Sequence, residues 1–221
     1  GNTVSGTTTS GEKAKIDVAF VLDTSGSMND KVGNSTRLKN MQNAITDNGG
    51  LSSVLFNSPD KIDAQVHVIT FASGLGLDGT SVLSTKADLD EVVNGLTANG
   101  ATHWEKGLER VSNISTRPGA TKYVVFLTDG DPGNKGWKET NVYSCGVLGL
   151  QTCDDNDSAR SVYNASVIAG KQLAKAGWNI LNVGVDMPTT VYVNPDADSV
   201  SGSNYDLRNH SLDRKSTRLN S

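Results

Sequence analysis

The chain has 221 residues, 36% of them hydrophobic, which is enough apolar material to fill the core of one large domain. Its formal net charge of −4 and its pI near 5.3 argue against binding to nucleic acid or to an anionic membrane surface. No apolar run reaches the length of about 20 residues that spans a bilayer, so we expect no membrane insertion of this segment.

The chain starts with a polar stretch and then turns apolar. Residues 1–14 are mostly Gly, Thr, Ser and other polar residues, a composition typical of a linker. We expect the domain to begin near Lys15. Residues 16–22 form an almost continuous apolar run, which indicates a parallel strand covered on both faces.

Strands and helices alternate along the rest of the domain. Apolar runs predict strands over residues 64–72, 123–127 and 178–185, with a short edge strand at Val82–Leu83. Apolar residues at helical spacing predict helices over Leu38–Ile45, 86–96, Trp104–Val111 and Val162–Leu173. This alternation predicts a doubly wound α/β fold, with a mostly parallel sheet and helices on both faces.

A long polar insert, about residues 131–157, contains both cysteines. Loops longer than about 15 residues are uncommon in compact domains and are more often functional or inserted. Cys145 and Cys153 would close a short loop if they paired. A disulfide suits an exported protein and two free thiols suit a cytosolic one, and the sequence favours neither.

The last nine residues, 213–221, have an unusual property. Their sequence can be reverse-translated without a mismatch into the start of a widely used short-read sequencing adapter. We therefore interpret them as a cloning or assembly artefact that is not part of the natural domain. On this interpretation the domain is truncated at its C-terminus, and the natural protein continues past about His210.

Three loops that follow predicted strands carry oxygen-bearing side chains. The first contains Asp23, Ser25 and Ser27, the second Thr102, and the third Asp129. Ligands of α/β sheets bind at the carboxyl ends of the strands, so we expect these side chains to converge on one crevice. Hydroxyls and carboxylates form an oxygen-only shell, which suits Mg²⁺ or Mn²⁺ and is poor for zinc.

The segment Asp23-Thr24-Ser25-Gly26-Ser27 resembles the D-x-S-x-S signature of the von Willebrand factor A domains. Thr102 in GATHWEKGL and Asp129 in FLTDG stand in the expected order for the same family. The resemblance extends over roughly residues 15–186. It implies a metal-ion-dependent adhesion site (MIDAS) in which Ser25, Ser27 and Thr102 contact the metal, and Asp23 and Asp129 act directly or through water.

The resemblance also implies a function and a cellular location. Residues 15–210 would form a von Willebrand factor A domain that binds a protein ligand, a host or extracellular matrix protein, through one of the ligand's carboxylates. The wording GATHWEKGL, the polar leader and the insert are most similar to Gram-positive surface and pilus-tip adhesins. We therefore expect an extracellular location, on the cell surface or associated with a pilus.

Other interpretations compete with this one. Thr102 and Glu105 form a T-x-x-E capping box, so Thr102 could cap a helix instead. The sequence lacks the second carboxylate motif of an aspartic protease and the G-x-S-x-G elbow of a serine hydrolase, so we expect no enzyme and assign no catalytic residue. An intracellular domain of the same family, a scaffold in a chelatase or ATPase assembly, would carry the same five site residues.

Overall fold

The computed structural model describes residues 12–128, 142–145, 151–154, 169–185 and 217–219. The strands are β1 (Ala14–Asp23), β2 (Lys31–Val32), β3 (Ser35–Thr36), β4 (Ile62–Phe71), β5 (Leu75–Asp78), β6 (Thr121–Thr128), β7 (Val142–Cys145), β8 (Gln151–Asp154), β9 (Trp178–Val185) and β10 (Thr217–Leu219). The helices are η1 (Gly26–Asn29), α1 (Arg37–Thr46), α2 (Leu51–Phe56), α3 (Lys86–Asn94) and α4 (Trp104–Val111), and residues 169–175 are also helical.

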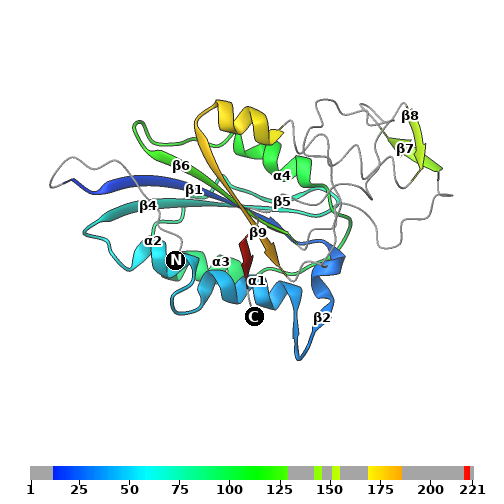
Figure 1. The fold of residues 1–221 in the computed structure, drawn as a ribbon, viewed down its shortest axis with the longest axis horizontal. Coiled ribbons are helices and arrows are strands. Elements are labelled where there is room, and N and C mark those ends of the chain that lie inside the picture. Colours follow the sequence, from blue (N-terminus) through cyan, green and yellow to red (C-terminus); the bar gives the residue numbers. More distant parts are fainter. Residues whose placement is uncertain (1–11, 129–141, 146–150, 155–168, 186–216, 220–221) are drawn as a thin grey trace.

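A six-stranded sheet in the order β10-β9-β6-β1-β4-β5 is the centre of the molecule. All neighbouring strands in it are parallel except β5, which runs antiparallel to β4. Helices α1, α2 and α3 cover one face, and α4 with the helical residues 169–175 covers the other (Figure 1). The predicted doubly wound α/β fold is confirmed.

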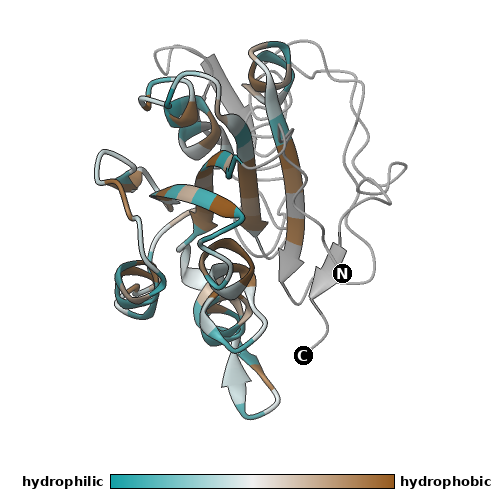
Figure 2. Cartoon of the chain, turned by 90° about the vertical axis from the view of Figure 1, so that its left-hand side faces the viewer, coloured by the Kyte–Doolittle hydropathy of each residue, from teal (hydrophilic) through white to brown (hydrophobic). Residues whose placement is uncertain are grey.

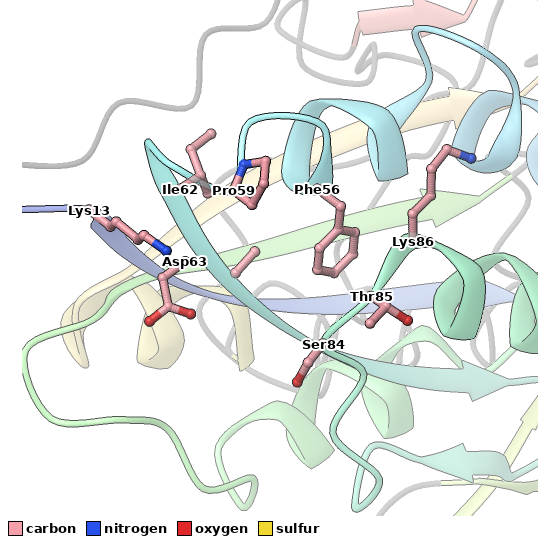
Figure 3. A pocket seen from close by; sticks show the side chains of 9 residues that line it. Lys13, Phe56, Pro59, Ile62, Asp63, Ser84, Thr85 and Lys86 are labelled. Atoms are coloured by element: carbon pink, nitrogen blue, oxygen red, sulfur yellow. The ribbon is translucent and has the colours of Figure 1, made fainter.

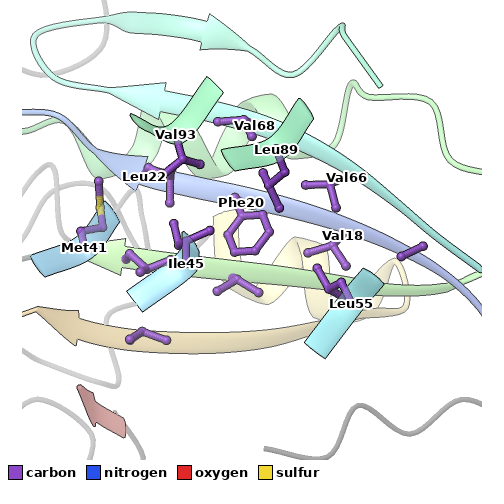
Figure 4. Close-up of a cluster of buried hydrophobic side chains, with 14 of the residues drawn as sticks. Val18, Phe20, Leu22, Met41, Ile45, Leu55, Val66, Val68, Leu89 and Val93 are labelled. Atoms are coloured by element: carbon purple, nitrogen blue, oxygen red, sulfur yellow. The ribbon is translucent and has the colours of Figure 1, made fainter. Parts of the chain in front are cut away.

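Side chains of β1 alternate between the two faces, as the period of two in a strand requires. Phe20 and its alternate neighbours pack with Met41 and Ile45 of α1 and Leu89 of α3 in the first core (Figure 4). Figure 2 shows hydrophobic residues along the central strands and hydrophilic ones toward the periphery. Because helices cover both faces of the sheet, the sequence of β1 is an almost continuous apolar run and does not alternate between apolar and polar residues.

The second core lies under α4. Phe71 of β4 stacks on Phe126 of β6 with 5.6 Å between ring centroids, and Trp104 of α4 meets Phe126 edge-on at 5.6 Å. These aromatic contacts join β4, β6 and α4 beside the carboxyl ends of the strands. They fix where the loops after these strands begin.

One local prediction was wrong, and one helix was missed. Val82–Leu83 is not an edge strand: Leu83 forms only an isolated antiparallel bridge with Val66, and the strand at this edge of the sheet is β5. The sequence of β5 is Leu-Gly-Leu-Asp, and all four residues are exposed. Such a segment shows no strand pattern, and it forms a strand because it pairs with β4. Helix α2 was not predicted, because its six residues are too few to show a helical period.

Short strands also occur in segments for which none was predicted. Strands β7 and β8 form an antiparallel pair within the insert. Strand β10 falls in the nine residues that we attribute to an adapter, and it pairs in parallel with β9. An open sheet edge presents unpaired backbone groups to any extended segment, so this pairing does not depend on side chains.

Candidate functional site

The site lies where β1, β4 and β6 end. Residue Leu22 of β1 is paired with Thr70 of β4 on one side and with Leu127 of β6 on the other. Because these strands are parallel, their carboxyl ends meet at one edge of the sheet. The first predicted loop therefore starts between the ends of the other two strands, as expected from the sequence.

Asp23 is the fixed point of this site. It is the last residue of β1 and is fully buried. Its Oδ1 accepts hydrogen bonds from the backbone N–H of Ser25 at 2.9 Å and from the Ser25 hydroxyl at 2.5 Å. Its Oδ2 accepts a hydrogen bond from the Thr128 hydroxyl at 2.8 Å. Donors from the first loop and from the end of β6 thus hold both carboxylate oxygens.

The two serines lie next to each other. The hydroxyl oxygens of Ser25 and Ser27 are 3.2 Å apart, Ser25 is buried, and Ser27 is partly exposed. Thr24 between Asp23 and Ser25 is anchored on β4, because its backbone N–H and its hydroxyl both donate to the carbonyl of Phe71, at 2.9 and 3.1 Å. The loop is therefore held in a shape that gathers three oxygen-bearing side chains.

Reciprocal backbone hydrogen bonds join this loop to the loop that contains Thr102. The N–H of Gly26 donates to the carbonyl of Gly100 at 2.8 Å, and the N–H of Asn99 donates to the carbonyl of Thr24 at 2.8 Å. A β-carbon on Gly26 would lie 3.4 Å from the Gly100 oxygen, so the two backbones approach closely. The structure thus brings two of the three predicted loops into contact.

Thr102 is buried and precedes α4, whose N-cap residue is His103. Thr102 therefore stands one residue before the assigned N-cap, and its interpretation as a helix-capping residue stays a prediction. The backbone before Thr102 is held by Ser73, whose hydroxyl accepts a hydrogen bond from the Ala101 N–H at 2.9 Å. The backbone just before Thr102 lies beside the first loop, through the hydrogen bonds of Asn99 and Gly100.

The structure does not describe Asp129 or the side chains of the two cysteines. Asp129 follows directly after Thr128, the last described residue of β6, and is itself outside it. The register of β7 and β8 places Cys145 opposite Gln151 and Cys153 opposite Tyr143. The disulfide between these cysteines stays a prediction.

The chemistry of the described site fits a hard divalent cation. It offers the carboxylate of Asp23 and the hydroxyls of Ser25 and Ser27 close together, and such oxygen donors suit Mg²⁺ or Mn²⁺. Within the described residues, no three His, Cys, Asp or Glu side chains form a metal-binding group. The donors here are mainly hydroxyls, and they come from one loop that the protein holds in place.

A cleft of about 540 Å³ lies at the opposite end of the sheet, between the start of β4, the end of α2 and the start of α3 (Figure 3). Phe56, Pro59 and Ile62 form its apolar wall. Of its charged residues, Lys86 pairs with Asp90, and Asp63 pairs with Arg117 at 2.8 Å. The cleft shares no residue with the hydroxyl-rich loops, so we do not place the function there.

Residues 18–132, slightly more than half of the chain, match the model of the von Willebrand factor type A domain. The chain belongs to this family. No curated protein matches the sequence significantly. None of the helices in the described ranges is both long and apolar enough to cross a membrane.

Several solved structures have the von Willebrand factor A fold of this chain. The vWF domain of the type V pili tip protein Mfa5 from Porphyromonas gingivalis is 12% identical, with a TM-score of 0.57 over 78% of this chain and 81% of that one. The PilB minor pilin from Streptococcus sanguinis is 18% identical, with a TM-score of 0.55 over 79% of this chain and 51% of that one.

A third structure was solved with metal. Proximal thread matrix protein 1 from the mussel byssus, with a zinc-occupied MIDAS motif, is 26% identical, with a TM-score of 0.52 over 78% of this chain and 36% of that one. The chain therefore spans 51% of PilB and 36% of the mussel protein. The similarities to Mfa5 and PilB establish the fold alone.

Thr128 was not among the predicted site residues of this von Willebrand factor A domain. The apolar runs that end in Leu22 and Leu127 are followed directly by the polar residues Asp23 and Thr128, respectively. Aligning the ends of these two predicted strands would have placed the hydroxyl beside the carboxylate.

Proposed function

We propose that this domain is a divalent-metal-dependent adhesion module, which captures an acidic residue of a protein ligand. The residues proposed to hold Mg²⁺ or Mn²⁺ are Asp23, Ser25, Ser27, Thr102 and Asp129. The observation that carries the proposal is the contact between the first two loops. In it Asp23 accepts from the Ser25 hydroxyl, the Ser27 hydroxyl lies 3.2 Å from that of Ser25, and Gly26 donates to Gly100. On this proposal the protein binds and does not catalyse.

The chain's own residues prepare the site. The Ser25 hydroxyl donates a hydrogen bond to Asp23, which leaves an oxygen lone pair of Ser25 available to a cation. Asp23 is held on both oxygens, so it keeps its orientation whether or not a cation is present. When bound, the metal ion would supply an electron-poor centre with coordination positions open to a ligand carboxylate. Because the donors are pre-positioned, little ordering is left for the binding step.

The comparisons support an adhesive role and an extracellular location. Mfa5 is a pili tip protein and PilB a minor pilin. The mussel protein was solved with zinc in a MIDAS motif. By analogy we propose that this domain works on a cell surface or a pilus, and that its ligand is a host or extracellular matrix protein.

The proposal is tested by adhesion of the full chain to a panel of immobilised extracellular matrix proteins, with Mg²⁺ or with a chelator. We expect binding to at least one protein in Mg²⁺ only. Asp23→Ala and Thr102→Ala should abolish it while circular dichroism and cooperative unfolding show an intact fold. Full binding by either folded variant would contradict the mechanism.

A further inference from the structure

We propose that Thr128 is a positioning residue of the metal site, which acts on the cation through Asp23 and not by contact. This inference rests on the proposed metal-binding function. Thr128 is the last residue of β6 and is 6% exposed. Its hydroxyl donates to Asp23 Oδ2 at 2.8 Å, across a separation of 105 residues in the sequence.

The strand register explains why these two residues meet. Leu22 of β1 is paired with Leu127 of β6, so the next residue on each strand, Asp23 and Thr128, lies beside the other. Neighbouring residues in a parallel pair point to the same side of the sheet. The contact is therefore set by the pairing of the two central strands.

The hydrogen bond fixes the rotation of the Asp23 carboxylate. With Oδ2 held by Thr128, Oδ1 faces the backbone N–H and the hydroxyl of Ser25. The orientation of Asp23 in turn directs the Ser25 proton away from Ser27, whose hydroxyl oxygen is 3.2 Å from that of Ser25. Loss of the Thr128 hydroxyl would leave a buried carboxylate oxygen with one donor fewer and free the carboxylate to turn.

Partners of metal ligands commonly change metal affinity by about 10–100-fold when they are removed. We therefore expect Thr128→Val, in the full chain, to weaken Mg²⁺ binding by about tenfold or more in a calorimetric titration. Thr128→Ser keeps the donor and should bind Mg²⁺ within about threefold of the wild type. If Thr128→Val does not fold, Thr128→Ala removes the same donor without adding a methyl group.

Thr70→Val is the matched control. Thr70 is also a buried threonine near the end of a central strand, and it flanks Leu22 on the β4 side. Its hydroxyl accepts a hydrogen bond from the Leu77 N–H at 2.8 Å, outside the site. Both valine variants should lose a similar amount of stability, but only Thr128→Val should lose metal affinity. Equal affinity of wild type and folded Thr128→Val would overturn the inference.

A measurement without metal separates this inference from the proposed function. The Ser25 amide donates to Asp23, so its proton chemical shift in NMR spectra reports the orientation of that carboxylate. We expect the resonance to shift in Thr128→Val and to stay near its wild-type position in Thr128→Ser and Thr70→Val. An unshifted resonance in Thr128→Val would contradict the role of Thr128, whether or not the wild type binds metal. Absence of metal binding by the wild type would contradict only the proposed function.

Discussion

Two aspartates of β1 have different surroundings, although both are almost fully buried. Asp17 Oδ1 accepts a hydrogen bond from the Arg117 guanidinium at 2.8 Å, and its Oδ2 accepts one from the Arg117 backbone N–H at 2.5 Å. Asp23 accepts hydrogen bonds from the neutral groups of Ser25 and Thr128. We infer that Asp17 serves the stability of the domain and that Asp23 serves the site.

Arg117→Ala should therefore destabilise the domain strongly. Removing one partner of a buried ion pair leaves the other charge without compensation, and this commonly costs about 3–5 kcal/mol. Arg117 is 20% exposed in its ion pair with Asp17 and its backbone N–H remains, so we expect a loss near the lower end, about 3 kcal/mol. Urea denaturation measures this loss.

Asp63→Ala is the control for the same arginine. Asp63 pairs with Arg117 at 2.8 Å, but its side chain is 47% exposed. Exposed ion pairs contribute about 0–1 kcal/mol, so this variant should lose less than about 1 kcal/mol. Equal losses in the two variants would show that burial of Asp17 does not decide the effect.

The effect of Arg117→Ala should not depend on pH near neutrality. Burial alone would lower the pKa of the Arg117 guanidinium, but its hydrogen bonds to Asp17 and Asp63 outweigh burial and raise the pKa. A cation whose pKa is raised by folding contributes stability at all pH values below its unfolded pKa, and this contribution is lost only as the pH rises through the folded value. We expect a constant difference in unfolding free energy from wild type between about pH 6 and pH 9.

At the scale of elements, the site depends on how the first two loops meet. Gly100 has a φ of +91°, which favours glycine, and a β-carbon there would lie 2.7 Å from the Ser73 hydroxyl oxygen. The same residue accepts the hydrogen bond from Gly26. Gly100 is thus needed both for its own backbone conformation and for the approach of Ser73.

Gly100→Ala should push the second loop away from Ser73 and displace Thr102. We expect Mg²⁺ affinity to fall by about tenfold in a calorimetric titration. Gly33→Ala is the matched control, because Gly33 has a φ of +61° but no atom within 4 Å of its β-carbon position. Both variants should lose about 1–2 kcal/mol of stability through backbone strain. Unchanged affinity in Gly100→Ala would show that this contact does not shape the site.

The central elements could be predicted from the sequence because buried strands and helices need apolar residues at regular positions. The buried strands β1, β4, β6 and β9 read as apolar runs, and α1, α3 and α4 show a helical period. Strand β5 is exposed at the sheet edge, and its pairing comes from a neighbour distant in sequence. Such an element leaves little local pattern, since tertiary context decides it.

The candidate site was predictable to a similar degree. The local motif places Asp23, Ser25 and Ser27 in one loop, and the structure joins them by hydrogen bonds. The contact of Gly26 with Gly100 and that of Thr128 with Asp23 are tertiary and depend on strand register. A sequence motif identifies the proposed metal ligands. The residues that position these ligands can be identified only when the pairing of the strands is known.

At the scale of the whole molecule, two hydrophobic cores lie on the two faces of one sheet, and the site lies at the end of that sheet. A cation held there would link loops that follow strands belonging to both cores. We therefore expect the metal to stabilise the folded state as a whole. At a Mg²⁺ concentration of about 100 times the dissociation constant, the free energy of unfolding should rise by about 2.7 kcal/mol.

Urea denaturation of the full chain, with Mg²⁺ or with a chelator, measures this stabilisation. Asp23→Ala is the control, and its stability should be the same under both conditions. An equal rise in the variant would mean that Mg²⁺ acts at another place on the protein. Unchanged stability of the wild type at high Mg²⁺ would contradict the proposed linkage.

The most direct test of the metal site is an isothermal calorimetric titration of Mg²⁺ and Mn²⁺ into the full chain, with Asp23→Ala and Asp129→Ala as controls. We predict saturable binding of one ion per chain in the wild type and none in either folded variant. Absence of binding by the folded wild type, or equal binding by the variants, would contradict the assignment of these loops as a metal-dependent adhesion site.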